Sequence, residues 1–269
     1  MAPLRHTDGA GPNASTAALF LLFEPKQRPD RGAVIAAMEQ IPLASVIHDP
    51  RAKGSRDSAA SSHREFADHD WLELLLAGLS FDLLGMAPGP YMNLPQDAQA
   101  IGFDSGFDPH SGEALALVPG PHIADDASSL PIVRAWLQLA CDLVEKLGRV
   151  EAVCWGPARL VTPASMFLAG VRGWLSGGPF PALNLVATES AEDNRVQSRG
   201  LDYLIGQEVL LDATLSDDRI AAAKLLARLA HRLTGEGAVQ DVRQLALEDG
   251  SAFVLTPSQS GTVLEVSRM

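Results

Sequence analysis

The sequence predicts an α+β protein made of two adjoining ferredoxin-like halves, each a split βαβ unit, with a mixed and largely antiparallel sheet. One observation is that short apolar runs, typical of strands, alternate with longer segments whose apolar residues recur at helical spacing. A second is the order of elements from residue 150 onward: strand, helix, strand, strand, helix, strand and hairpin. We therefore divide the chain into halves at 17–149 and 150–269, and expect residues 1–16 to be disordered.

The first half opens with the apolar run 18–24, which has the composition of a strand buried on both faces. Asp30 is a suitable N-cap for a helix over residues 31–40. The polar residues of 44–70 predict a long loop or insert. Two apolar runs follow, at 71–77 and 79–85, with a bend at the glycine between them.

The rest of the first half begins with an irregular surface segment, predicted up to Ser111 by its glycine, proline and aspartate content. A strand is expected at 113–118. A helix then begins near Leu130 with Pro131 in its first turn, has its apolar residues at three-and-four spacing, and ends at Gly148. This helix leads into the second half.

In the second half, a strand is predicted at 151–155, and Thr162 is expected to cap the next helix. A strand at 182–188, a polar loop and a strand at 208–212 follow. Ser216, with two aspartates after it, opens a helix whose leucines form one face and which ends at a glycine. Two or three strands complete the chain, with a hairpin turn at Asp249 and Gly250.

The composition argues against several classes of partner. The chain has 33 acidic and 21 basic residues, a net charge of −12, which repels nucleic acids and anionic membranes. Its 2 cysteines do not form a disulfide framework, so we expect a cytoplasmic protein in a reducing compartment. The longest basic cluster, Lys224, Arg228 and Arg232, falls on one helix face and is interpreted as solvated. We expect no cofactor.

Several features of the second half form a recognisable pattern. They are a strand that ends at Trp155 and is followed by Pro157 and Ala158, a strand at 183–187, the stretch 199–203 leading to Glu208 and Val209, and an amphipathic helix. In this pattern the chain resembles a bacterial family known only as domain of unknown function 4261. The resemblance covers residues 150–250 and an opening strand at 19–24, whereas the insert at 44–70 is a departure from it. It implies a bacterial protein with that family's fold, and it implies no catalytic residues, because the family has no established activity.

One local cluster has side chains able to bind a metal ion: His63, Asp68, His69 and Asp70. A metal site needs three or four such ligands held by a fixed scaffold. These residues lie in the polar insert, so a solvated loop is the competing interpretation.

Cys154 is the candidate nucleophile, because a thiolate at a strand end near a histidine is the arrangement that a cysteine-dependent hydrolase uses. Its neighbours Val153 and Trp155 favour the alternative that it is a small buried apolar residue. Cys141 lies beside the apolar face of its helix, which favours the same interpretation.

A final candidate is a binding surface formed by Trp155, Arg159, Arg172 and Arg199. Tryptophan and arginine are enriched where protein interfaces concentrate their binding energy. The alternative is that the tryptophan belongs to the core and that the arginines are solvated.

These observations predict a non-enzymatic interaction or regulatory module whose partner is a protein. The reason is that no nucleophile elbow, phosphate loop or other convergent polar motif is visible in the sequence. A small hydrolase or transferase is the alternative, with a site assembled from distant residues that include Cys154 or a histidine. A metal-dependent module using the His63 cluster is a third.

Overall fold

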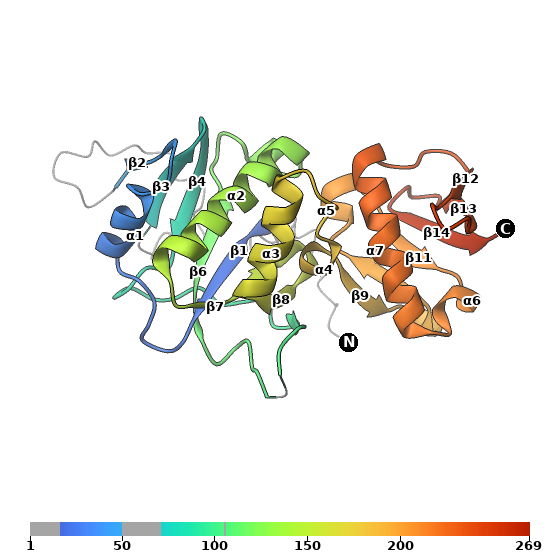
Figure 1. Ribbon diagram of the computed structural model, residues 1–269, viewed down its shortest axis with the longest axis horizontal. Coiled ribbons are helices and arrows are strands. Elements are labelled where there is room, and N and C mark those ends of the chain that lie inside the picture. The colour runs from blue at the N-terminus through green and yellow to red at the C-terminus, as the bar shows by residue number, and fades with distance from the viewer. Residues whose placement is uncertain (1–16, 50–70, 105) are drawn as a thin grey trace, which may run out of the picture.

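The computed structural model describes residues 17–49, 71–104 and 106–269 (Figure 1). These residues form an α+β protein with two mixed, mostly antiparallel sheets, as the sequence predicts at this level. The expected disorder of residues 1–16 and most of the polar insert fall outside the described residues.

The larger sheet has eight strands in the order β2-β3-β4-β6-β1-β7-β8-β5. Neighbouring strands are antiparallel except β5 and β8, which are parallel. The central strand β1 is buried along its whole length, because it lies between β6 and β7. The strands are β1 (Leu19–Phe23), β2 (Ala44–His48), β3 (Trp71–Leu76), β4 (Leu79–Leu84), β5 (Gln99–Ala100), β6 (Glu113–Pro119), β7 (Val150–Trp155) and β8 (Leu160–Pro163).

Three helices cover one face of this sheet: α1 (Arg31–Met38), α2 (Leu130–Leu147) and α3 (Ala164–Leu175) (Figure 1). Asp30 caps α1, as predicted, by accepting a hydrogen bond from the backbone N–H of Ala33 at 2.8 Å. The indole N–H of Trp136 in α2 donates to the backbone oxygen of Leu117 in β6 at 3.2 Å. This bond fixes α2 against the sheet while its apolar side packs into the core.

The other face of the larger sheet carries a smaller apolar cluster. The segment between β4 and β6 contributes Met92 to it as a buried residue, with Phe103 and Phe107 packed against it. The two phenylalanine rings are stacked, with centroids 3.7 Å apart. This segment was predicted to be irregular surface, and it is irregular except for β5, but it also covers the second face of the sheet.

The smaller sheet has six strands in the order β12-β13-β14-β11-β10-β9, antiparallel except for the β11–β14 pair. The Asp249–Gly250 turn joins β12 to β13, as predicted. The strands are β9 (Ala187–Ser190), β10 (Val196–Arg199), β11 (Glu208–Leu211), β12 (Arg243–Ala246), β13 (Ala252–Pro257) and β14 (Val263–Arg268). The helices of this part are α4 (Ala182–Leu185), α5 (Asp202–Ile205), α6 (Ala213–Ser216) and α7 (Arg219–Glu236).

The division between the sheets differs from the predicted boundary at residue 150. Strand β7, at Val150–Trp155, pairs with β1 in the larger sheet, and β8 pairs with β7. The second half therefore does not begin a sheet of its own at this point, and the ferredoxin-like arrangement is not confirmed. The physical reason is that the apolar run of β1 needs a strand on both sides, and β7 supplies the second.

Four local predictions are corrected by the structure. Residues 182–185 form α4 after Pro181, so only the last part of the strand predicted at 182–188 is extended. Thr162, predicted to cap the next helix, lies instead in β8 at residues 160–163, because Leu160 and Val161 pair with β7 and are buried. Residues 44–48, at the start of the expected insert, form the edge strand β2, and residues 196–199 form β10 within the expected polar loop.

One continuous apolar core joins the two sheets. It includes Trp136 and Trp155 from the first part of the chain and Leu229 and Val266 from the second. The glycine turn before α5 also meets the turn between β7 and β8 of the larger sheet, since an added Cβ at Gly200 would lie 2.7 Å from the Cβ of Ala158. Among the described residues, no helix is long and apolar enough to cross a membrane.

Candidate functional site

A cleft of about 750 Å³ lies between α3 and α7. Its volume falls in the range of about 300–1,000 Å³ that is typical of ligand-binding clefts. Its walls come from α3, from the turn and helix α4 that follow, from α7, and from the end of β12. The lining residues are Ala169, Gly170, Gly173, Trp174, Pro179, Phe180, Pro181, Ala182, Leu183, Asn184, Ala227, Arg228, His231, Arg232, Ala246, Leu247 and Glu248.

The wall formed by α3 has two glycines with different roles. A Cβ at Gly170 would lie 2.2 Å from the side-chain oxygen of Asn184, so glycine is required for α4 to pack this close to α3. The Asn184 amide is buried and donates to the Thr162 hydroxyl at 3.3 Å. At Gly173, an added Cβ would meet no atom within 4 Å. This second glycine leaves open space in the wall of the cleft.

One end of the cleft is aromatic. Trp174 and Phe180 are arranged edge to face, with ring centroids 5.6 Å apart. The guanidinium of Arg134 lies 4.5 Å from the centre of the Trp174 ring and donates to the backbone oxygen of Leu175 at 3.1 Å. Leu183 nearby is 59% exposed. A rigid aromatic pair beside an exposed leucine is a surface that favours an apolar side chain.

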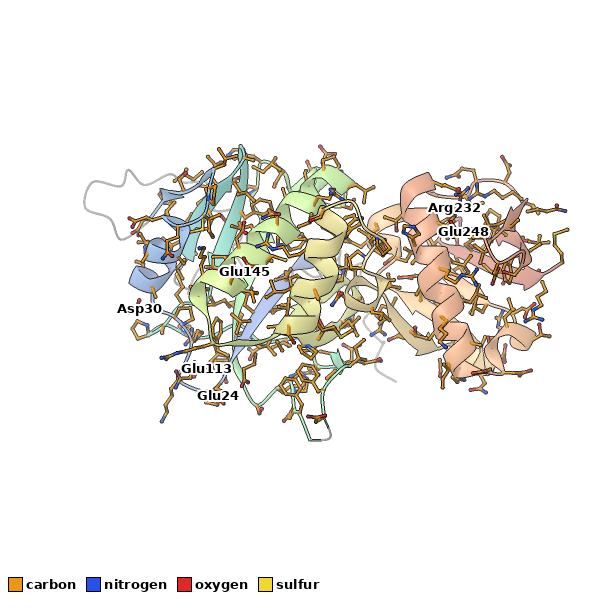
Figure 2. The ribbon with its side chains drawn as sticks, in the orientation of Figure 1. Glu24, Asp30, Glu113, Glu145, Arg232 and Glu248 are labelled. Carbon is orange, nitrogen blue, oxygen red and sulfur yellow. The ribbon has the colours of Figure 1, made fainter. Side chains whose placement is uncertain are left out.

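The wall formed by α7 carries polar donors. Arg228 pairs with Asp249 at 2.8 Å, and Arg232 pairs with Glu236. Figure 2 labels Arg232 and Glu248, which both line the cleft. Neither Asp249 nor Glu236 lines the cleft, so the lining has two guanidinium groups and one carboxylate.

His231 lies between these arginines on the same helix face. Its Nδ1 accepts a hydrogen bond from the backbone N–H of Phe180 at 3.1 Å. A ring nitrogen that accepts carries no proton, so the neutral ring keeps its proton on Nε2 and can donate there. The bond also fastens the turn before α4 to α7. Arg228 and Arg232 therefore line the cleft. They are two of the three residues of the basic cluster that the sequence analysis interprets as solvated.

Two of the four residues predicted as a binding surface come together elsewhere. Arg159 and Arg199 share the carboxylate of Asp97, which lies 3.2 Å from the Arg199 guanidinium. Arg199 also pairs with Glu189 at 2.8 Å. Burial alone would raise the pKa of Asp97, but the hydrogen bond and charge of Arg159, together with the charge of Arg199, lower it. These ion pairs join the larger sheet to the smaller one.

The other two members lie apart from this group. Trp155 is 1% exposed, with its ring centroid 5.0 Å from that of Trp136 and 5.7 Å from that of Tyr203, so it belongs to the core. Arg172 joins α3 to α2 through Asp142 at 2.6 Å and Glu145 at 2.8 Å. The four residues therefore do not form one surface.

The candidate nucleophile Cys154 is fully buried in the second apolar cluster, and burial raises the pKa of its thiol far above the usual range. Cys141 is also buried, and burial raises its pKa to about 12. Both are neutral thiols out of reach of a substrate. The metal candidates His63, Asp68, His69 and Asp70 lie outside the described residues. In the parts of the chain that are described, no group of three potential ligands that could hold a metal ion is present.

Glu208 has a raised pKa, and the sequence analysis did not identify it as a candidate. Burial, followed by a hydrogen bond with Asp202, raises its pKa to about 8. Its carboxyl accepts from the backbone N–H of Gly200 at 2.5 Å and is also bonded to the Ser198 hydroxyl. These partners lie on β10 and in the turn after it, so no local sequence motif could reveal the site.

Comparison of the chain with protein-family models, with curated proteins and with solved structures gave no match. The class of this protein is defined by its own fold and cleft. It is an α+β protein whose two sheets share a core and whose cleft has one aromatic end and one polar wall.

Proposed function

We propose that this protein is a non-enzymatic interaction module that binds a partner protein in the cleft between α3 and α7. The observation that supports the proposal best is the composition of the cleft, with glycines and an aromatic pair on one side and arginines on the other. Tryptophan and arginine around a small apolar floor are the residue types that concentrate binding energy in protein interfaces.

The geometry also supports a preformed site. Trp174 is held by Arg134 and Phe180, and His231 holds the turn that carries Phe180. Side chains that are already fixed lose little conformational freedom when a partner binds. The resemblance to domain of unknown function 4261 remains a prediction, and the proposal does not depend on it.

The alternative proposal, a small hydrolase or transferase with a site assembled from distant residues, has one observation in its favour. Glu208 is a carboxyl with a pKa near 8, and perturbed pKa values are frequent at catalytic sites. Its oxygens, however, accept hydrogen bonds from the Gly200 N–H and the Ser198 hydroxyl, and this structural role is sufficient to explain a buried carboxyl at this position. An activity found on a broad substrate panel and lost in Glu208→Gln would support the enzyme instead.

The test of the interaction module uses a variant that fills the cleft. Gly173→Leu places a side chain in the open space of the α3 wall without a Cβ clash. Gly235→Leu is the matched control, because Gly235 also has no atom within 4 Å of an added Cβ but does not line the cleft. The tagged chain and both variants are purified from the source cells, and each captured protein is then made separately and titrated against the purified chain.

We expect a partner that binds the original chain and Gly235→Leu equally, and binds Gly173→Leu at least about tenfold more weakly. Circular dichroism of both variants is the check that each keeps the fold. A partner whose affinity is the same for Gly173→Leu would show that the cleft is not the binding site.

A further inference from the structure

We propose that the partner's binding segment is an extended peptide that adds to the edge of β12 as a further strand. Its apolar side chain enters the aromatic end of the cleft, and an acidic side chain meets the arginines of α7. This inference rests on the proposed function and specifies the chemistry of the partner.

The first support is the open edge of the smaller sheet. Strand β12 is the last in its sheet, with β13 on one side and no described strand on the other. The backbone N–H of Leu247 donates to Ser251 at 2.8 Å, and Ala246 is opposite Ala252. Because an antiparallel strand turns its backbone groups alternately to its two sides, those of Ala246, the residue before Leu247, point away from β13.

The second support is the position of this edge. Ala246 and Glu248 are exposed, and both line the cleft. Ala246 is the last residue of β12, so a peptide that pairs with this edge would run past the end of the strand into the cleft. Alternate side chains of a strand point to opposite faces, so every second side chain of the peptide would face α7 and the aromatic pair. Gly173 leaves the room for one of them to enter.

The third support is charge complementarity. The cleft lining has Arg228 and Arg232 against a single carboxylate, Glu248, in a chain whose net charge is −12. Arg228 bonds Asp249 through one terminal nitrogen, and Arg232 bonds Glu236 through Nε, so each keeps further N–H donors. The Nε2–H of His231 lies on the same helix face. An acidic side chain of the peptide could therefore accept hydrogen bonds from these groups. The net charge of the whole chain would by itself favour a basic partner, so the preference for an acidic residue is specific to the cleft.

The probe is a display library of random octapeptides, selected on the immobilised full chain. We expect the selected peptides to share a large apolar residue with an aspartate or glutamate two positions away, because residues two apart lie on the same face of a strand. One selected peptide is then synthesised with a fluorescent label, and its affinity is measured by anisotropy. A selection that yields basic peptides, or no enrichment over an unrelated protein, would overturn the proposal.

Two substitutions at one position test the strand pairing. Ala246→Pro removes the outward N–H without removing a bond to β13, and Ala246→Val keeps that N–H. We expect the proline variant to bind about tenfold more weakly, equivalent to about 1.4 kcal/mol, and the valine variant to bind like the original chain. Should Ala246→Pro fail to fold, the same peptide with its strand-pairing nitrogens methylated supplies the test on the unchanged protein.

The outcomes separate the two proposals. If Gly173→Leu loses the peptide while Ala246→Pro and the methylated peptide bind normally, strand addition is wrong and the cleft remains the binding site. If both Gly173→Leu and Ala246→Pro bind normally, both proposals fail. If an organic acid such as benzoate competes fully with the peptide and Ala246→Pro has no effect on either, the cleft is a small-molecule site and strand addition is overturned.

Discussion

Replacing each of the two cleft glycines of α3 by alanine should change stability in opposite directions. Alanine in a helix interior is more favourable than glycine by about 0.5–1 kcal/mol, because glycine loses more backbone freedom on folding. At Gly173 the new methyl group meets nothing within 4 Å, so we expect Gly173→Ala to raise the free energy of unfolding by about that amount.

At Gly170 the same change should destabilise the fold. The new Cβ would lie 2.2 Å from the Asn184 side-chain oxygen, and Asn184 is only 3% exposed. To make room, Asn184 must leave the Thr162 hydroxyl or α4 must move. An unsatisfied buried polar group costs about 1–3 kcal/mol, which exceeds the gain in helix propensity. We expect a net loss of about 1–2 kcal/mol for Gly170→Ala.

Urea denaturation followed by far-UV circular dichroism measures both changes in one experiment. The two variants carry the same substitution in the same helix, so their difference, expected to be about 2 kcal/mol, reports the tertiary contact alone. Equal stability of Gly170→Ala and Gly173→Ala would refute the reasoning, because it would show that Asn184 does not constrain α3.

Three further predictions concern Glu208, Arg172 and the two cysteines. The free energy of unfolding should fall as the pH rises from 4.5 to about 8, because Glu208 keeps its proton in the folded state and has released it in the unfolded state. In urea denaturation at several pH values, Glu208→Gln should flatten this pH dependence. The same pH dependence in the original chain and in the variant would contradict the prediction. Arg172→Gln should lower the free energy of unfolding by about 1 kcal/mol, and by less in high salt, because it breaks two partly exposed ion pairs between α3 and α2. Equal losses at low and high salt would argue against an ionic cause. Cys141 and Cys154 should resist alkylation by iodoacetamide until the protein unfolds, which mass spectrometry of the folded and urea-treated chain would show, and rapid labelling in the folded state would contradict their burial.

The elements with strong local signals were predictable from the sequence. The apolar run of β1, the three-and-four spacing of α2 and the Asp249–Gly250 turn each specify their structure without help from distant residues. The burial of Cys154 was likewise anticipated by its apolar neighbours. The local sequence pattern was sufficient for these elements because their tertiary contacts favour the same secondary structure as the pattern does.

Where tertiary contacts decide the structure, the sequence was less informative. The run ALNLVAT reads as a strand, but Pro181 and the contact of Asn184 with Gly170 place its first residues in α4. The placement of β7 beside β1 depends on pairing over more than 100 residues, which no local pattern reveals. For the same reason, the cleft and the raised pKa of Glu208 were invisible, since their residues meet only in the folded chain.

The two walls of the cleft belong to layers on different sheets, so its width depends on how the sheets are joined. The join is tight at the Gly200 turn, where the positive φ of 91° and the approach to Ala158 leave no room for a side chain. Tyr203, just after this turn, packs edge-on against Trp155 of the larger sheet, and Arg199, just before it, bonds Asp97. These contacts and the shared core join the layer that carries α3 to the layer that carries α7. A partner segment would then meet a cleft that is already formed, and more of its contact energy would appear as affinity.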